Sequence, residues 1–289
     1  MIKAIHEEIV YKKSTFPLSH NRAIHHQSGD TPPHGAIAWH EDIEIKIFRK
    51  GSMSINVDNS VFDVCEGDII IINPYEIHQN LKFYQETYYE SLIFNVKIML
   101  SKLSYTFDQN NFTKLLNGGI KINRILRKND KFAKLFDMLV DEFTKNSPEK
   151  ELALVTLTLY ILTTLLREQS MTISSDESIR YAESLRRLEP LTRYIKENIG
   201  ENLSLQVLAD VSSFNPKYLS YLFKKTIGLN LNEYIAQLRL IRAQELLSST
   251  DKKIGSIALE LGFMYENYFI RWFKKLVGIT PSVYRAGKD

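Results

Sequence analysis

One stretch decides the fold of the C-terminal part of this chain: it runs SLQVLADVSSFNPKYLSYLFKKTIG at residues 204–228 and recurs as KIGSIALELGFMYENYFIRWFKKLVG at residues 253–278. Identical residues return after 49 or 50 positions, as Ala209 and Ala258, Phe223-Lys224-Lys225 and Phe273-Lys274-Lys275, and Gly228 and Gly278. A slip of one residue within the turn accounts for the two offsets. Such an internal repeat predicts two copies of one supersecondary unit in tandem.

Each copy is predicted to fold as two short helices joined by a tight turn. In the first copy, Ser204 can accept a backbone N–H bond at a helix start, and Asn215-Pro216 offers a cap followed by proline at the first helical position. Leu219 and Phe223 then recur at the spacing of a buried helix face. The second helix keeps a polar, basic outer face, which is the layout of a helix-turn-helix.

The outer face of the second helix in each copy holds the candidate DNA-contacting residues. In the first copy they are Lys217, Ser220, Tyr221, Lys224 and Lys225, and in the second they are Glu266, Asn267, Ile270, Arg271, Lys274 and Lys275. Arg271 suits a guanine, because a guanidinium can bond two acceptors on that base. The lysine pairs suit phosphates. Ile270 suits a thymine methyl group, and Glu266 either accepts from a cytosine amino group or points away.

The segment between the copies predicts a helix that sets their separation. Asn230 and Glu233 have the spacing of a capping box. From Leu231 to Leu247 the chain suits one helix about 25 Å long. Such a rod could hold two recognition helices about 34 Å apart, which is the repeat of the major groove along one side of DNA.

Charge is distributed unevenly along the chain. The sequence has 37 Lys+Arg and 34 Asp+Glu, a net +3; the residues from Arg186 onward carry 16 and 10 of these, a net +6, and the rest carries −3. A basic C-terminal part is expected where a domain meets a polyanion. The single Cys65 excludes an internal disulfide. No apolar run reaches the roughly 20 residues of a membrane span, and the N-terminal charges argue against a leader, so we expect a cytoplasmic protein.

The N-terminal region predicts a small β domain followed by a helical layer. Residues 43–48 and 52–57 alternate between apolar and polar side chains, and residues 69–72 form a short buried run between turn residues. Closely spaced short strands indicate a sandwich or barrel. From residue 132 onward the apolar period becomes helical.

The stretch Leu152–Leu166 is apolar on nearly every side of the predicted helix. It therefore needs cover on more than one face. A second copy of the chain could provide that cover, and so could the rest of the same monomer. The polar residues after Met171 show no apolar period and suggest a linker.

The stretch from Leu203 to Arg285 resembles the DNA-binding domain of the AraC/XylS family. The matching motifs are Leu203-Ser204-Leu205, Leu208-Ala209, Tyr218-Leu219-Ser220, Leu222-Phe223-Lys224, Gly262-Phe263, Tyr268-Phe269, Phe273-Lys274-Lys275, Thr280-Pro281 and Tyr284-Arg285. The resemblance implies that the helices at residues 215–226 and 265–276 enter adjacent major grooves. Three positions depart from the family pattern, namely Tyr221 for a common arginine, Tyr265 for a common acidic residue and Ser213 for a common glycine. These departures affect the target sequence and not the mode of binding.

Residues 35–78 resemble the cupin-like sensor domain of many such regulators. His40 and Glu44 fit the first cupin motif from its second histidine onward, and the segment that ends at His78 resembles the closing motif. Ala38 stands where cupin enzymes have the first metal-binding histidine. We therefore expect His40, Glu44 and His78 to line an effector pocket, with no metal and no cofactor, although this set is chemically able to hold a metal.

The expected fold is α+β and multidomain. We expect a cupin-like β-barrel at residues 1–105, a helical dimerisation layer at 106–170, a linker at 171–185, and an all-α domain with two helix-turn-helix units at 186–289. The resemblance implies a sequence-specific transcription regulator, not an enzyme, that binds promoter or operator DNA and a small effector as a homodimer. RNA polymerase is a further candidate partner, and no membrane partner is expected.

Two alternative functions stay open at this point. One is a constitutive DNA binder whose N-terminal half only dimerises, and the other is a metal-dependent cupin enzyme with a DNA-binding tail. The sequence names neither the effector nor the operator, and it does not distinguish activation from repression.

Overall fold

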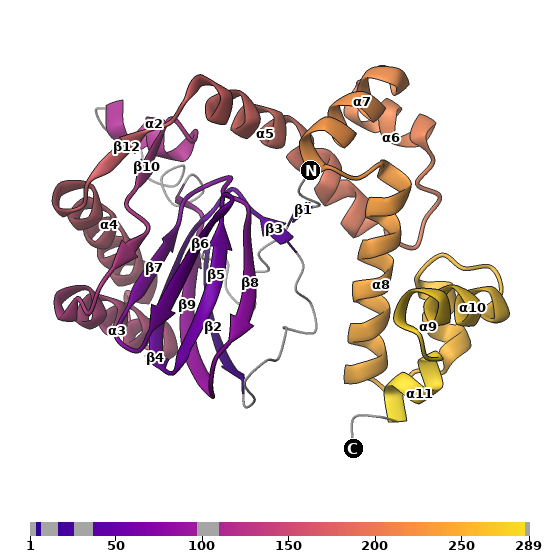
Figure 1. Cartoon of the computed structure of the whole chain (residues 1–289), viewed down its shortest axis with the longest axis horizontal. Helices are drawn as coiled ribbons and strands as arrows, with labels where there is room; N and C mark the ends of the chain where they lie inside the picture. The colour runs from indigo at the N-terminus through magenta and orange to yellow at the C-terminus, as the bar shows by residue number, and fades with distance from the viewer. Residues whose placement is uncertain (1–3, 7–16, 26–36, 97–109, 287–289) are drawn as a thin grey trace. The chain divides into compact units, whose positions relative to one another are not determined.

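The computed structural model describes residues 4–6, 17–25, 37–96 and 110–286. The chain divides into two compact units, one comprising Ala4–Arg186 and the other Arg187–Asp289 (Figure 1). The first unit combines β-sheets with helices, whereas the described part of the second contains only helices and their connections. The prediction of an α+β protein with an N-terminal β domain and a C-terminal helical domain is confirmed.

Two five-stranded sheets form the body of the N-terminal unit. The first has the strand order β1 (Ala4–His6), β3 (Ile37–Trp39), β8 (His78–Phe83), β5 (Ser52–Val57) and β6 (Ser60–Cys65). The second has the order β11 (Ile125–Leu126), β7 (Ile69–Ile72), β4 (Ile43–Lys50), β9 (Thr87–Phe94) and β2 (Leu18–His25). Neighbouring strands are antiparallel except for β1 and β3.

The alternation along β4 divides its side chains between two cores. Ile43 and Ile47 lie in a cluster shared with the helices, whereas Phe48 packs between the sheets with residues of β5, β7 and β8. Successive side chains of a strand point to opposite faces. Glu44 and Lys46 therefore point to the same side as Phe48, which places two buried charged residues between the sheets.

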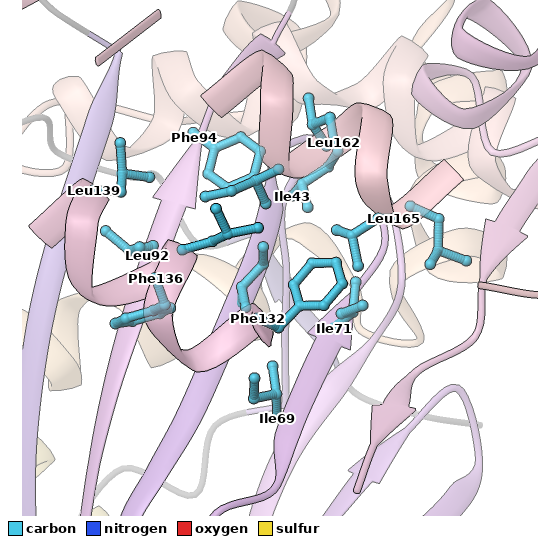
Figure 2. Packing of buried hydrophobic residues seen from close by; sticks show 14 of the residues in the cluster. Ile43, Ile69, Ile71, Leu92, Phe94, Phe132, Phe136, Leu139, Leu162 and Leu165 are labelled. Carbon is cyan, nitrogen blue, oxygen red and sulfur yellow. The ribbon is translucent and has the colours of Figure 1, made fainter. Parts of the chain in front are cut away.

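Two helices cover the outer face of the second sheet, as Figure 2 shows. They are α3 (Asp130–Thr144) and α4 (Lys150–Glu168). The residues of α3 that are buried match the predicted stripe, namely Phe132, Leu135, Phe136, Leu139 and Val140. They and the buried leucines of α4 pack against isoleucine, leucine and phenylalanine side chains of β4, β7 and β9. This apolar contact fixes the sheet whose other side carries Glu44.

The region between the β domain and the DNA-binding repeat contains more regular structure than predicted. After α2 (Asn110–Leu116), the predicted helical layer includes β10 (Ile120–Ile122) and β11. The segment predicted as a linker at 171–185 contains regular structure, because β12 (Met171–Ile173) pairs with β10 and α5 (Asp176–Glu197) begins soon after. Strands of two or three residues are too short to show a period in the sequence. The expected boundary at residue 105 lies outside the described residues.

Up to residue 286, where its described part ends, the C-terminal unit contains six further helices in chain order. They are α6 (Leu205–Ser212), α7 (Pro216–Ile227), α8 (Leu231–Ser249), α9 (Ile254–Glu260), α10 (Glu266–Val277) and α11 (Pro281–Ala286). Ser204, Asn215 and Asn230 each accept a backbone N–H at the start of α6, α7 and α8. Asn230 and Glu233 also form the predicted capping box.

The repeat in the sequence corresponds to repeated backbone geometry. Gly228 and Gly278 end α7 and α10 with φ angles of +81° and +90°. A residue without a Cβ adopts this left-handed conformation at little cost, which explains why glycine recurs there. In the turns between the paired helices, Ser213 has φ +56° and Gly262 has φ +78°. Ser213 thus takes a left-handed conformation that glycine would adopt at lower cost.

Candidate functional site

The predicted DNA-contacting residues lie on the outer sides of α7 and α10. In α7, all five are exposed, namely Lys217, Ser220, Tyr221, Lys224 and Lys225. In α10, Ile270 is half-buried and the others are exposed, namely Glu266, Asn267, Arg271, Lys274 and Lys275. Phe223 and Phe273 are buried at matching places in the two helices. Each helix therefore has one face anchored in a core and one polar face available to a partner.

The outer face of α7 is cationic and has no carboxylate among its predicted contact residues. Lys225 Nζ lies 5.6 Å from the ring centre of Tyr221, a cation–π distance that orders the phenol beside the ammonium. Lysine ammonium groups and a hydroxyl suit phosphate oxygens more than they suit one particular base. This face is better equipped for affinity than for discrimination between bases.

The outer face of α10 carries side chains that are able to discriminate between bases. Arg271 offers a guanidinium that can bond two acceptors of guanine, and Asn267 offers an amide that can pair with adenine in the same bidentate manner. Lys274 and Lys275 follow in the last turn, where cations also interact favourably with the helix dipole. The two recognition faces therefore differ in chemistry although they share a frame.

Glu266, the first residue of α10, lies close to α9. A Cβ placed on Gly255 would stand 2.6 Å from Glu266 Oε2, so the carboxylate rests against the first turn of α9. Helix N-termini attract anions, and α9 has no side-chain cap from Lys253. The sequence analysis left two possibilities, that Glu266 accepts from a cytosine amino group or that it points away from the bases. The contact with α9 fits the second possibility.

Arg187 is a basic residue beside the turn between α6 and α7. It was not identified from the sequence. Its Nη1 donates to the Tyr218 hydroxyl at 3.1 Å, and its guanidinium lies 5.3 Å from the ring centre of Phe214. Arg187 comes from α5, whose end belongs to the C-terminal unit. No local pattern in the sequence could have paired it with residues about thirty positions away.

In the N-terminal unit, the structure brings His40, Glu44 and His78 together as predicted, but as a compact buried cluster. The Nε2 atoms of His40 and His78 lie 3.6 and 3.7 Å from the same carboxylate oxygen, Glu44 Oε2. The centres of the two imidazole rings are 5.0 Å apart. The residues come from the β3–β4 connection, from β4 and from β8, so both sheets contribute to the cluster.

Lys46 joins this cluster and was not singled out from the sequence. Its Nζ lies 3.4 Å from Glu44 Oε1, and both side chains are buried. Burial alone would raise the pKa of the Glu44 carboxyl, but Lys46 and the two histidines hold this pKa well below its ordinary value. The available signal was the alternation of β4, which places Lys46 on the same face as Glu44.

Glu76 connects the cluster to a neighbouring ionic group. Its backbone oxygen lies 3.1 Å from His78 Nδ1. Its carboxylate accepts from Arg124 Nη2 at 2.7 Å and lies 3.3 Å from Lys121 Nζ. One residue thus links His78 to the segment of β10 and β11.

Two helix-turn-helix units with polar recognition faces, in a chain whose other unit encloses a polar cluster between two sheets, define a DNA-binding regulator with a ligand-binding domain. The family model for an AraC-like ligand binding domain matches residues 22–162, and the model for a helix-turn-helix domain matches residues 208–287. The chain belongs to the AraC family of transcription regulators. Among the described helices, none is long and apolar enough to span a membrane.

Relatives with known names match the chain over different lengths. The melibiose operon regulatory protein of Escherichia coli (strain K12) is 24% identical over 255 residues, which are 86% of this chain and 82% of that protein. The bifunctional transcriptional activator/DNA repair enzyme AdaA of Bacillus subtilis (strain 168) is 42% identical over 95 residues, or 33% of this chain and 45% of that protein. The chain likewise spans about half or less of the length of several other curated relatives that it matches.

The fold as a whole is shared with a solved structure. ToxT from Vibrio cholerae strain SCE256, crystallised with an unsaturated fatty acid, matches with a TM-score of 0.56 at 15% identity. The match covers 96% of this chain and 97% of that one. At this identity the likeness concerns the fold alone.

Proposed function

We propose that this chain regulates transcription by binding promoter or operator DNA in a sequence-specific manner, with α7 and α10 in adjacent major grooves. The observation that carries this proposal is the pair of exposed polar faces on two copies of one unit, one rich in lysine and one with Arg271 and Asn267. The 19 residues of α8 that join them correspond to about 28 Å. This length is comparable to the groove repeat of about 34 Å. The chain acts by binding, in the cytoplasm, without turning over its ligand.

Selection of bound sites from random double-stranded DNA with the full chain tests this proposal. We expect an enriched site with two short conserved boxes about one helical turn apart, roughly 10 base pairs centre to centre. The box read by α10 should be the more strongly constrained of the two. Enrichment of no site, or of a single box only, would contradict the use of both helices.

A homodimer is proposed to form through the outer face of α4. Leu152 and Tyr160 on this face are 62% and 53% exposed. The hydroxyls of Thr156 and Thr163 donate within the helix, to the backbone oxygens of Leu152 and Leu159, at 2.8 Å each. From Leu152 to Thr163 the exposed side chains of this face carry no charge and have little demand for water, which suits an identical helix from a second copy.

Sedimentation equilibrium at micromolar concentration tests this contact. The unmodified chain should sediment as a dimer, and Tyr160→Lys should sediment as a monomer, because it places an ammonium in an apolar contact. Met138→Lys on the exposed side of α3 is the matched control and should remain dimeric. A monomeric unmodified chain would refute the dimer.

The ligand of the N-terminal unit is proposed to bind at His40, Glu44 and His78. These buried charged and polar groups are brought together between two sheets by the β3–β4 connection, β4 and β8. A ligand changes DNA binding only by its different affinity for two states of the protein. Operator affinity should therefore change when the selected DNA is titrated in the presence of cell extract. Unchanged affinity would favour the constitutive binder.

A further inference from the structure

The donor atoms of His40, Glu44 and His78 converge on one point inside the N-terminal unit. One ligating atom from each lies within 4.8 Å of the others. The three side chains are 0%, 5% and 6% exposed, respectively. Donor atoms this close together and this deeply buried can all contact one ion.

The histidine tautomers are fixed by backbone oxygens behind the rings. His40 Nδ1 lies 3.1 Å from the backbone oxygen of Asp42, and His78 Nδ1 lies 3.1 Å from that of Glu76. A carbonyl oxygen can only accept, so both Nδ1 atoms must carry the hydrogen. In a neutral ring the lone pair is then on Nε2, the atom that faces Glu44. Metal-binding histidines are oriented by this same outer bond.

The distances from the histidines to the carboxylate fit ligands of one ion better than they fit hydrogen bonds. The separations of 3.6 and 3.7 Å between Nε2 and Oε2 exceed the range of about 2.7–3.2 Å for a good N–H···O bond. Two ligands about 2.1 Å from a tetrahedral ion stand about 3.4 Å apart. These two separations are therefore close to the separation expected for two ligands of one ion.

The two oxygens of Glu44 face different cations. Lys46 Nζ approaches Oε1 at 3.4 Å, whereas both histidines approach Oε2. A single oxygen thus remains directed toward the histidines, as a monodentate ligand would be. The nearby ammonium must repel a bound cation, so Lys46 limits the affinity of the site.

We infer that His40 Nε2, His78 Nε2 and Glu44 Oε2 bind a divalent first-row transition ion, with Zn²⁺ and Co²⁺ as suitable probes. Imidazole nitrogen together with carboxylate suits such ions. Three protein ligands leave a further position for water or for an anionic group of an effector. The inference names the ligand class of the proposed sensor site, and it replaces the sequence-based expectation of a site without metal.

Titration of the metal-free full chain with Co²⁺, followed by its visible d–d absorption and by elemental analysis, tests the inference. One ion per chain should bind with a spectrum unlike that of hydrated Co²⁺, and Zn²⁺ should abolish the spectrum by displacement. Glu44→Gln and His78→Gln should each weaken binding by more than about 100-fold, the upper end for loss of an outer partner. His20→Asn, a histidine outside the cluster, is the matched control and should bind normally.

Lys46→Met provides a variant that keeps all three ligands. Removal of the adjacent positive charge should tighten Co²⁺ binding by at least about tenfold, and Zn²⁺ should raise the melting temperature of this variant more than that of the unmodified chain. Absence of a Co²⁺ spectrum, binding that persists in Glu44→Gln and His78→Gln, or unchanged affinity in Lys46→Met would each overturn the inference. Binding of the metal-free chain to selected DNA is measured separately, so failure of the metal site leaves the DNA-binding proposal standing, and the reverse also holds.

Discussion

The two helix-turn-helix units share a frame, but they differ in what holds each of them together. The first begins its helices with side-chain caps from Ser204 and Asn215. The second has no side-chain cap from Lys253 or Tyr265. It is held instead by packed aromatic rings, with the ring of Phe263 5.3 Å from Phe269 and 4.9 Å from Trp272.

The units differ on their outer faces in a related way. The cluster of aromatic rings immobilises α10, the helix that presents Arg271, and discrimination between bases requires a side chain held in a fixed geometry. The lysines of α7 need less precise placement, because a phosphate attracts an ammonium from many directions. We therefore expect most of the sequence preference to come from the second unit and a larger share of the nonspecific affinity to come from the first.

The largest effect should come from removal of the aromatic core. Phe273 is fully buried and its ring lies 5.5 Å from that of Tyr284. Phe273→Ala should cost about 3–5 kcal/mol of unfolding free energy, measured by chemical denaturation. In site selection it should eliminate the box read by α10 and keep the other box. Phe223→Ala, which removes the ring beside Tyr234, should have the converse effect. Loss of both boxes in both variants would show that the units do not act separately.

The turns of the two units should respond differently to the same residue. A Cβ on Gly262 would lie 2.5 Å from the backbone oxygen of Gly200. Gly262→Ser should therefore destabilise the protein by about 2–3 kcal/mol, since left-handed strain and overpacking add together. Urea denaturation measures this loss. A loss below about 1 kcal/mol would mean that the loop at Gly200 yields easily.

The recognition faces should be separable by substitution. Arg271→Ala should lose about 1–3 kcal/mol of discrimination at one base position, while Lys224→Ala should weaken all DNA sequences alike and flatten the salt dependence. Fluorescence anisotropy with matched and mismatched sites at several salt concentrations measures both effects. If the two variants behave identically, the division of labour between α7 and α10 is incorrect.

The stabilising effect of a side-chain cap should be lost from the first unit, and gained by the second, through single substitutions at the start of α7 and α10. Asn215→Ala should cost about 1 kcal/mol, because it removes the acceptor at the start of α7. Tyr265 has extended backbone angles at the start of α10, φ −131° and ψ 130°, which suit a cap. Tyr265→Asn should therefore raise stability by about as much. Thermal denaturation of both variants tests the pair, and a destabilised Tyr265→Asn would show that the phenol has a packing role.

The smallest effect is expected at Ser213. Its φ of +56° is costly for a residue with a Cβ. Ser213→Gly should raise the unfolding free energy by about 0.5 kcal/mol, because relief of strain outweighs the added entropy of the unfolded chain. Urea denaturation in parallel with Gly262→Ser gives the measurement. A loss of stability would indicate that the serine side chain contributes more than its backbone costs.

Local backbone demands made most of the helical unit predictable from the sequence. Asn215, Asn230 and Gly228 each satisfy a requirement within a few residues of chain, so their types reveal helix starts and ends. Glu266 could not be assigned in this way, since its direction depends on the absence of a Cβ at Gly255 in another helix. Arg187 was missed for the same reason, because its partners are Phe214 in the turn between α6 and α7 and Tyr218 in α7.

The buried cluster of His40, Glu44 and His78 shows the same limit of prediction from sequence more clearly. The sequence predicted the set of His40, Glu44 and His78, because two motifs resembled those of a known domain. It did not predict that Lys46 would share the carboxylate, or that backbone oxygens would fix both histidine tautomers. Those features follow from the pairing of strands and from the path of the chain between them. They are the features from which we infer that an ion binds at this site.

The length of helix α8 sets the separation of the two helix-turn-helix units. It therefore also sets the spacing that an operator must have in order to contact both. Tyr234 near the start of α8 packs on the first unit, with its ring 5.2 Å from that of Phe223, and Ala243, Leu246 and Leu247 near the end of α8 belong to the core of the second. Each residue of an α-helix advances about 1.5 Å and turns by about 100°. One residue inserted in the middle of α8 would rotate one helix-turn-helix unit by about 100° about the axis of α8, relative to the other unit. The operator would then be out of phase with the protein that reads it, even though every contact residue was still present.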